Sequence, residues 1–310
     1  MEKKPLDDQE LESHLDRISP DGIDIFLLRR GNFRGALVNG TRLVNQMRAN
    51  HELGVLESFI LGHAYLGGAL LTSNVKGNDR MGLSIQCSGS AEHISVESSA
   101  NGMVRGYLQN PEIPIDAPLD TFDMSPFIGD GILSVTKYIE DAKQPFTGSV
   151  SLEYGNIAQD LAFYYYRSEQ TPTAISLSVQ FDHEARIVGA GGLLVQAFPG
   201  TEDERTGDLD SQVRDFPSLG SMLSEGKSPH AIVQEQLQDF EPISVGERNV
   251  EFYCPCSKDR FSRYLAAMPT EEIRDIRDNG PFPLKTTCHN CNTTYEFSQD
   301  EIEELYQMSR

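Results

Sequence analysis

The chain has 310 residues and carries 47 Asp and Glu against 26 Lys and Arg, which gives a formal net charge of -21. This length allows one large domain or two. The negative field repels phosphate backbones and the basic residues do not cluster, so we expect no nucleic-acid partner. No stretch approaches about 18 consecutive apolar residues. The first residues lack the apolar run of a secretion signal, so a cytoplasmic protein without a membrane partner is predicted.

Residues 1–198 are predicted to form one α+β unit, because runs of strands stand beside a few helices. Helical spacing predicts one helix from near Asn45 or His51 to about Leu70, and another over 157–168. Asn101-Gly102 predicts a hairpin with a type I′ turn, which needs positive φ at both residues. Apolar alternation predicts strands at 23–29, 34–38, 83–87, 93–96, 103–108, 132–137 and 173–181.

Residues 199–247 differ from the rest of the chain in composition. They hold eleven Asp and Glu against Arg205, Arg214 and Lys227, a net charge of -8. Such a segment can dock weakly on a neighbour and detach readily, or it can be an ordinary acidic linker, and the sequence leaves both interpretations open. Apolar side chains at helical spacing predict short amphipathic helices through Leu209, Val213, Phe216, Leu219, Met222, Leu223, Ile232, Val233, Leu237 and Phe240.

Residues 248–310 are predicted to be a compact module. Thr270 is expected to cap a helix that Gly280-Pro281 closes. Ser298 to Glu301 reads as a capping box for a terminal helix that carries Ile302, Leu305 and Met308. About 60 residues with so few large apolar side chains need further stabilisation to fold.

Four of the five cysteines can supply that stabilisation. Cys254 and Cys256 form one close pair, Cys288 and Cys291 another, and the 31 residues 257–287 separate them. Four thiolates suit a tetrahedral Zn²⁺, and a domain this small should be unfolded or nearly so without it. The polar residues around Cys291 predict a zinc-knuckle turn between two strands. The spacing leaves a static structural zinc site and a redox-active site equally open.

The close first pair favours the redox-active interpretation. Cysteines one residue apart can oxidise to a strained, small-ring disulfide, and zinc-bound thiolates are already deprotonated. Oxidation would expel zinc and unfold the module. An iron–sulfur centre is disfavoured because nothing nearby suggests an electron-transfer partner site. A thioredoxin-type motif would open a helix, whereas residues 292–297 predict a strand.

The remaining candidates receive structural interpretations. His289 is predicted to be a solvent-facing turn residue, and Cys87, which alternates with Leu83 and Ile85, a buried core thiol. The glycine cluster at 189–192 is expected to form a turn before a strand. The seven histidines are scattered, and no phosphate loop or nucleophile elbow is present, so we expect no enzyme.

The chain resembles the thirty-three-kilodalton heat-shock chaperone family, the redox-regulated holdases. Cys254, Cys256, Cys288 and Cys291 match that family's zinc motif, which is the specific part of the resemblance. The similarity covers most of the chain and weakens in about the first twenty residues and in the acidic linker. Further similar stretches are 67–71, 76–80, 102–107, 133–137, 168–172 and 191–196.

The resemblance implies an α+β core over 1–198, a helical linker over 199–247 that lies on it, and a zinc-binding redox switch over 248–310. It implies that oxidation forms the disulfides Cys254–Cys256 and Cys288–Cys291 and releases one Zn²⁺. The linker would then lose its order and expose apolar surface that holds unfolding client proteins without ATP, as a homodimer. The competing hypothesis is a constitutive zinc-stabilised interaction protein or enzyme whose C-terminal module never switches.

Overall fold

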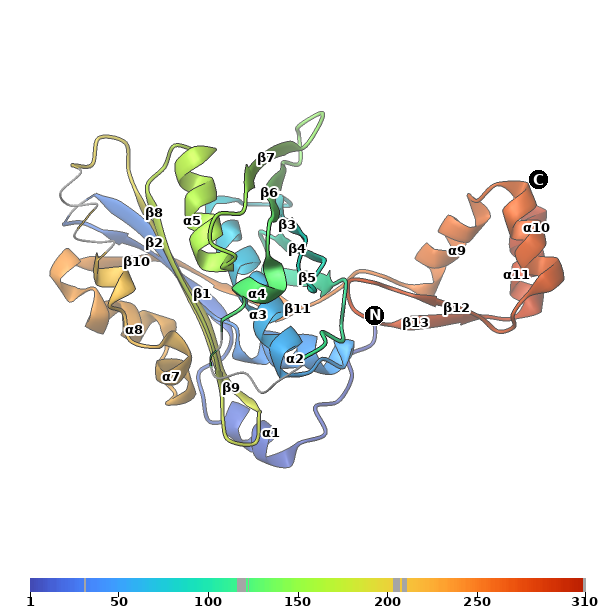
Figure 1. The fold of residues 1–310 in the computed structure, drawn as a ribbon, viewed down its shortest axis with the longest axis horizontal. Helices are drawn as coiled ribbons and strands as arrows, with labels where there is room; N and C mark the ends of the chain where they lie inside the picture. Colours follow the sequence, from blue (N-terminus) through green and yellow to red (C-terminus); the bar gives the residue numbers. More distant parts are fainter. Residues whose placement is uncertain (31, 116–120, 122, 203–206, 208–210, 309–310) are drawn as a thin grey trace. The chain divides into compact units, whose positions relative to one another are not determined.

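The computed structural model describes residues 1–30, 32–115, 121, 123–202, 207 and 211–308. The chain divides into two compact units (Figure 1). The larger unit spans Lys4–Phe252, and the smaller unit combines Met1–Lys3 with Tyr253–Arg310. Residues 199–247 belong to the larger unit. Sheets that are antiparallel except for the short β11–β5 pair, together with interspersed helices, confirm the α+β class.

Two sheets form the frame of the larger unit in the described part of the chain. The five-stranded sheet has the order β10-β1-β2-β9-β8 and is antiparallel throughout. Its strands are β1 (Gly22–Leu28), β2 (Phe33–Asn39), β8 (Thr173–Phe181), β9 (Ile187–Ala197) and β10 (Pro242–Asn249). The six-stranded sheet has the order β11-β5-β4-β3-β6-β7. Its strands are β3 (Arg80–Cys87), β4 (His93–Ser99), β5 (Met103–Leu108), β6 (Gly131–Tyr138), β7 (Phe146–Ser151) and β11 (Glu251–Phe252).

Helix α3 (Val55–Leu71) is the core helix of the larger unit. It packs against strands of both sheets, and each of its residues after Val55 is buried. Among the described residues, the run Val55–Asn74 is long and apolar enough to cross a membrane, but 94% of its most apolar window is buried inside the fold. The other helices of the core are α1 (Gln9–Leu15), α2 (Thr41–His51), α4 (Ser125–Ile128) and α5 (Ile157–Arg167).

The single helix predicted to begin near Asn45 or His51 is in fact two helices. The Asp21 carboxylate accepts the backbone N–H groups of Arg42 and Leu43, which starts α2 earlier than its apolar spacing suggests. Glu52 adopts a left-handed conformation with φ of 57°, and this ends α2 before α3 begins. Because the apolar pattern continues across the break, periodicity alone did not reveal it.

Two turn predictions were wrong in detail. The hairpin between β4 and β5 exists, but of Asn101 and Gly102 only Gly102 has a positive φ, so the turn is not type I′. The glycine cluster at 189–192 lies inside β9 and makes no turn. Small residues are needed there because a neighbouring helix approaches closely: a Cβ on Gly189 would lie 1.9 Å from the backbone oxygen of Gly220.

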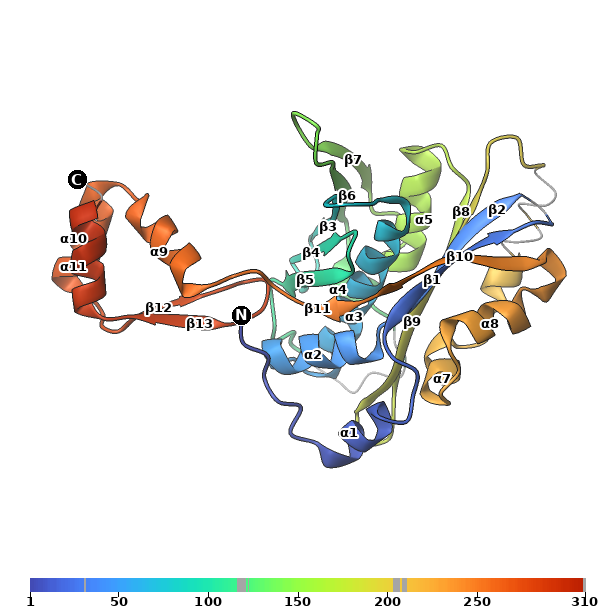
Figure 2. The same cartoon turned by 180° about the vertical axis from the view of Figure 1, so that it is seen from behind.

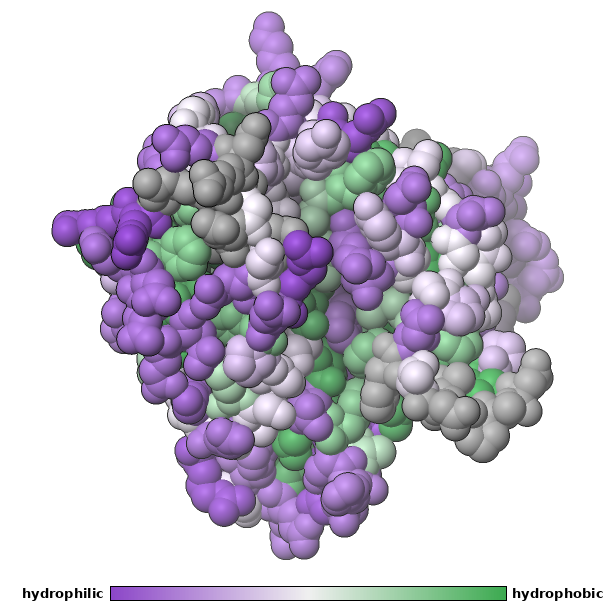
Figure 3. Space-filling view, turned by 60° about the vertical axis from the view of Figure 1, so that its left-hand side comes forward, coloured by the Kyte–Doolittle hydropathy of each residue, from purple (hydrophilic) through white to green (hydrophobic). Residues whose placement is uncertain are grey.

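Two helices from the acidic segment cover the outer face of the five-stranded sheet (Figures 1 and 2). These linker helices are α7 (Leu219–Ser224) and α8 (Pro229–Gln236), and the Ser218 and Ser228 side chains cap their first turns. The predicted amphipathic helices are confirmed at Leu219, Met222 and Leu223 in α7 and at Ile232 and Val233 in α8. Phe216 and Leu237 lie outside these helices, and Leu209 lies outside the described residues. On this side of the molecule the exposed surface is mostly hydrophilic, with hydrophobic side chains lying in furrows (Figure 3).

The smaller unit contains a hairpin and three helices in its described residues. They are α9 (Lys258–Ala266), α10 (Thr270–Asn279), β12 (Leu284–Thr287), β13 (Thr294–Phe297) and α11 (Gln299–Met308). The capping box is confirmed, since Ser298 N–H donates to Glu301 and Glu301 N–H donates to Ser298. Thr270 was wrongly predicted as a cap, because Pro269 holds that position. Met308 is 76% exposed and contributes nothing to the core that Ile302 and Leu305 help to form.

Candidate metal centre

The first cysteine pair lies in the extended segment that leads into α9. Ser257 follows directly and caps that helix, its Oγ accepting the N–H of Arg260 at 3.2 Å. The helix cap therefore fixes the direction in which the chain leaves Cys256. Cys254 and Cys256 are 0% and 6% exposed, so both thiols face the interior of the smaller unit.

The second pair occupies the turn between β12 and β13. The carbonyl oxygen of Cys288 accepts the N–H groups of Cys291 and Asn292, and Asn292 takes a left-handed φ of 55°. Cys288 N–H in turn donates to the Thr293 carbonyl at 2.9 Å. The predicted knuckle-like turn between two strands is confirmed.

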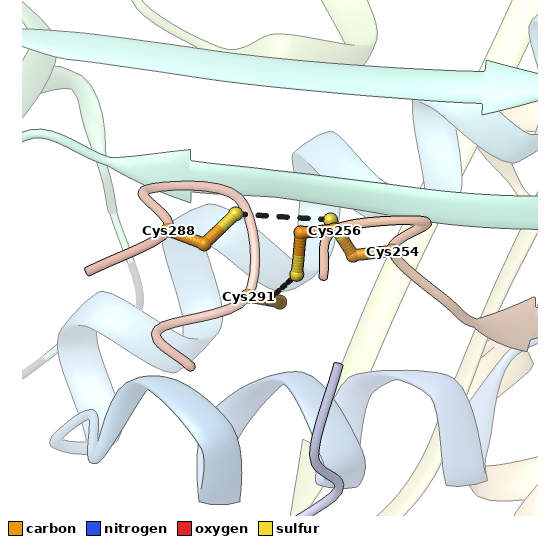
Figure 4. A group of neighbouring side chains, drawn as sticks. All are labelled: Cys254, Cys256, Cys288 and Cys291. Carbon is orange, nitrogen blue, oxygen red and sulfur yellow. Dashed lines mark hydrogen bonds between the residues drawn. The ribbon is translucent and has the colours of Figure 1, made fainter. Parts of the chain in front are cut away.

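The fold brings the four sulfurs together (Figure 4). The Sγ atoms of Cys254, Cys256, Cys288 and Cys291 all lie within 4.8 Å of one another, and all four residues are buried. Two of the separations between the pairs are 3.8 Å, from Cys254 to Cys288, and 3.3 Å, from Cys256 to Cys291. A tetrahedral ion with Zn–S bonds of about 2.3 Å requires sulfurs about 3.8 Å apart. The donor set and its spacing therefore fit one zinc ion.

The crowding of the sulfurs makes the cluster electrostatically dependent on a cation. The hydrogen bond to Cys254, with a further contribution from burial, raises the pKa of Cys288 well above its usual range. The same partner and burial raise the pKa of Cys291 to about 11. A divalent cation would reverse this preference, because its charge stabilises coordinating thiolates. The four cysteines can therefore bind a divalent cation as thiolates, and without a cation their thiols stay protonated.

Three residues around the cluster were not anticipated from the sequence. Tyr295 Oη lies 3.1 Å from Cys256 Sγ, and Thr293 Oγ1 lies 3.3 Å from Cys291 Sγ. Alternation along the chain that enters β13 places Thr293 and Tyr295 on one face, but the left-handed turn at Asn292 separates them from Cys291, so alternation alone does not connect them to the cysteines. The third residue is Met1, whose amino group donates to the Cys256 carbonyl at 2.9 Å and whose Sδ lies 2.8 Å from Cys254 N. No sequence pattern points to it.

The other residues singled out from the sequence lie outside the cluster. His289 is exposed within the second turn, as predicted. Cys87 ends β3 and is only partly buried, so its assignment as a fully buried core thiol was wrong. Its Sγ lies 3.4 Å from the Glu92 carbonyl oxygen, and burial raises the pKa of this thiol. Leu83 and Ile85, its neighbours on the strand, are buried because they lie deeper in the sheet.

Comparison with known proteins identifies the family. The sequence pattern of the Hsp33 protein family matches residues 21–298. A 33 kDa chaperonin of Limosilactobacillus fermentum is 35% identical over 89% of this chain and 94% of its own length. One from Aquifex aeolicus is 33% identical over 88% of this chain and 86% of its own length.

A solved structure supports the same relationship. The crystal structure of the 33 kDa chaperonin (heat shock protein 33 homolog) from Thermotoga maritima superposes with a TM-score of 0.82 at 29% identity. It covers 93% of this chain and 98% of that protein. The range matched by the family, 21–298, includes residues of both compact units, and the chain belongs to the Hsp33 family of chaperones.

Proposed function

We propose that this protein is an oxidation-activated, ATP-independent holdase that binds unfolding client proteins. The observation that carries the proposal is the cluster of four buried cysteine sulfurs within 4.8 Å in a small, separate unit. In this proposal residues 1–198 bind clients and form a homodimer, residues 199–247 act as a releasable linker, and residues 248–310 form the switch. The protein acts in the cytoplasm and binds its clients without catalysing a reaction on them.

In the reduced state Cys254, Cys256, Cys288 and Cys291 hold one Zn²⁺. The ion supplies the positive charge that keeps the four thiols ionised and joins two segments far apart in the sequence. The unit's core consists of a few side chains, among them Ile273, Phe297 and Ile302. Zinc binding and folding of such a unit are coupled, so loss of the ion is loss of the fold.

Oxidation removes the metal because it converts ligands into disulfides. Two thiolates give up two electrons to a peroxide, which takes two protons and leaves as two waters, and a sulfur–sulfur bond forms. A disulfide across the pairs, such as Cys254–Cys288, would tie together residues 34 apart and stabilise the unit. The pairing that the family resemblance implies, Cys254–Cys256 and Cys288–Cys291, leaves the two segments unlinked, and we propose it here.

The linker helices cover the surface that clients would use. On the sheet, Phe26, Phe33 and Leu193 are at most 1% exposed, because Leu223 of α7 and Ile232 of α8 belong to the same apolar cluster. A polar contact adds to this packing: His230 Nδ1 of α8 lies 3.5 Å from the buried Asp24 Oδ2 on β1. Release of α7 and α8 would expose a continuous apolar sheet face, the kind of surface that binds unfolded chains.

The chain itself connects the switch to the linker. From α8 it runs through β10 and β11 and reaches Cys254 two residues after β11 ends. When the smaller unit unfolds, the segment after β11 loses its anchor, and the linker becomes the least stable part of the remaining structure. The net charge of -21 then keeps client complexes in solution.

The test is to treat the zinc-loaded chain with hydrogen peroxide at mildly elevated temperature. Zinc release, thiol loss and suppression of aggregation of a heat-unfolded client enzyme are followed together. We expect the three to proceed in parallel without ATP, with the dimer fraction rising in sedimentation. Peptide mapping should find Cys254 linked to Cys256 and Cys288 to Cys291.

The matched control is Cys87→Ser, which removes the thiol that lies outside the cluster. This variant should release zinc and gain holding activity as the unaltered chain does. Zinc that stays bound, or that leaves without any gain in holding activity, would instead support a static zinc module. A requirement for Cys87 would show that the cluster is not the switch.

A further inference from the structure

A cavity of about 520 Å³ lies in the larger unit just beyond the end of α3. Its lining comes from β1, β2 and β9 of the five-stranded sheet, from residues 73–76, and from Ile139 and Arg248. A volume of this size is typical of small-molecule sites. We propose that the cavity binds an organic monocarboxylate with an apolar chain, the chemical class of the medium-chain fatty acids.

The apolar part of the cavity follows from the alternation of side chains along β1. Phe26 and Leu28 belong to the cluster under the linker helices, so Ile25 and Leu27 point to the opposite face, where the cavity lies. Leu27 is 37% exposed, and so is Ile139, which also lines the cavity. An apolar ligand chain that covers these side chains gains free energy from the surface it removes from water.

The charge of the lining is opposite to the charge of the chain. Arg34, Lys76 and Arg248 line the cavity, and Asp79 is the one carboxylate beside them, which leaves a net charge of +2 in a chain of -21. Within the described part of the chain, neither Arg34 nor Lys76 forms an ion pair with a carboxylate. With 47 acidic residues available to 26 basic ones, cations left without such a partner around a cavity favour an anionic ligand.

Arg34 is held in place by a bond that uses only one of its donors. Its Nε donates to Gln196 Oε1 at 3.2 Å, and its Cζ lies 6.0 Å from the centre of the Phe198 ring. Gln196 is 1% exposed, and its Oε1 also accepts Asn74 Nδ2 at 3.0 Å, so this acceptor is fixed. A guanidinium has five N–H donors, and its two terminal nitrogens match the two oxygens of one carboxylate.

Arg248 contributes charge to the same cavity. Its terminal nitrogens donate to the backbone carbonyl oxygens of Thr72, Ala100 and Val75. These partners carry no net charge, so they leave the positive charge of Arg248 in place. The lining therefore favours a carboxylate over an uncharged molecule of the same chain length, while the negative charge of the whole chain disfavours polyanions.

The test is a calorimetric titration of the reduced, zinc-loaded chain with octanoate, before any oxidant is added. Octanol offers the same apolar chain without the charge, and acetate offers the charge without the chain. Octanoate should bind more tightly than either by about fivefold or more, because only octanoate uses both parts of the cavity.

Arg34→Gln should weaken octanoate binding by about three- to tenfold and leave octanol binding unchanged, since it removes the guanidinium alone. Arg34→Lys keeps the charge and should recover part of the affinity. The matched control is Arg167→Gln, which makes the same change at an exposed arginine of α5 outside the cavity lining. This control should bind octanoate as the unaltered chain does.

Several results would overturn the inference. Octanoate that does not bind at millimolar concentration, octanol or acetate that binds as tightly as octanoate, or unchanged octanoate binding in Arg34→Gln would each do so. If Arg34→Gln loses octanol binding as well, its cavity has collapsed, and Lys76→Gln decides: it must weaken octanoate binding alone, or the inference fails. All these measurements use the reduced chain, so they do not depend on the proposed redox function, and failure of that function leaves them unaffected.

Discussion

At the residue scale, substitution of Cys256 tests the assignment of the four cysteines as metal ligands. Cys256 is 6% exposed, lies 3.3 Å from Cys291 Sγ and receives the Tyr295 hydroxyl at 3.1 Å. In Cys256→Ser one thiolate ligand is replaced by an alcohol that stays protonated at neutral pH. Loss of a partner outside the coordination sphere already costs about 10- to 100-fold in metal affinity, so loss of a ligand should cost at least tenfold.

Chelator competition on the reduced chain measures this prediction. Cys87→Ser is the control, because it makes the same chemical change on a thiol of the other unit. In Cys256→Ser, proteolysis of the segment 199–247 should also begin without oxidant. Unchanged zinc affinity together with unchanged protease resistance would remove Cys256 from the ligand set.

The residues of the site differ in how far the sequence could predict them. The four cysteines are recognisable because two close pairs of thiols are rare outside metal and redox sites. Thr293 and Tyr295 lie on one face of the chain that enters β13, but the left-handed turn at Asn292 separates them from Cys291, so their contacts with the cysteines could not be predicted before the turn was known. Met1 contacts a residue 255 positions away, and such a contact depends on the tertiary fold alone.

At the element scale, the acidic linker shows why composition is a poor guide to docking. Its charge suggested weak association, yet Leu219, Leu223 and Ile232 are at most 1% exposed. The predicted helices are confirmed because apolar residues at helical spacing form one face. The partner of that face could not be predicted, because the sheet that receives it is assembled from strands such as β1 and β9, which are far apart in the sequence.

The close approach of β9 and α7 gives a prediction for Gly189→Ala. A Cβ there would lie 1.9 Å from the Gly220 carbonyl oxygen, so the helix or the strand must move. Overpacking of this kind costs about 1–3 kcal/mol. If the helix gives way, the open state of the linker becomes about 5- to 150-fold more populated, and the reduced chain should show holding activity without oxidant.

Hydrogen exchange of the amides in α7 measures the opening directly. The control is Gly246→Ala on β10, where an added Cβ has no described atom within 4 Å. Exchange in this control should match that of the unaltered chain. If Gly189→Ala exchanges as slowly as the control, α7 is not held by this contact and the glycine cluster in β9 needs another explanation.

At the scale of the whole molecule, the sequence predicts the fold class but not the order of the strands in the sheets. The α+β class could be predicted because strand and helix periodicities were clear. The strand order β10-β1-β2-β9-β8 could not be predicted, because it pairs β1 with β10, which lie near opposite ends of the larger unit's sequence. The start of the helix predicted near Asn45 or His51 was misplaced for a related reason, since Asp21, from a preceding segment, determines where α2 begins.

The buried core gives the whole molecule a predictable response to acid. His63 of α3 is 6% exposed, and burial lowers its pKa to about 4. Its Nδ1 lies 2.7 Å from the Phe59 carbonyl, so the neutral ring donates there. In the unfolded chain the pKa of a histidine is about 6.5. Between these values the unfolded state binds a proton that the folded state does not, so stability falls as pH falls.

One buried carboxyl opposes this effect over part of the range. Burial raises the pKa of Asp21 from 3.8 to about 6, so the folded state binds the extra proton there and gains stability as pH falls below about 6. His63 therefore dominates between about pH 6.5 and 6, and the two groups offset each other below that. A variant without His63 should become more stable relative to the unaltered chain by about 1.4 kcal/mol per pH unit across the window.

Urea unfolding of zinc-loaded His63→Gln and of the unaltered chain at pH 7, 6 and 5 measures this difference. The amide of glutamine can still donate to Phe59, so the substitution removes the titration and retains a donor. The pH dependence of zinc binding and the titration of Asp21 are the same in both chains. Their contributions to the unfolding free energy therefore cancel in the comparison. The gap in unfolding free energy should change in favour of the variant by about 2 kcal/mol between pH 7 and pH 5. Parallel curves would mean that His63 is protonated inside the fold, which its apolar surroundings in α3 make costly.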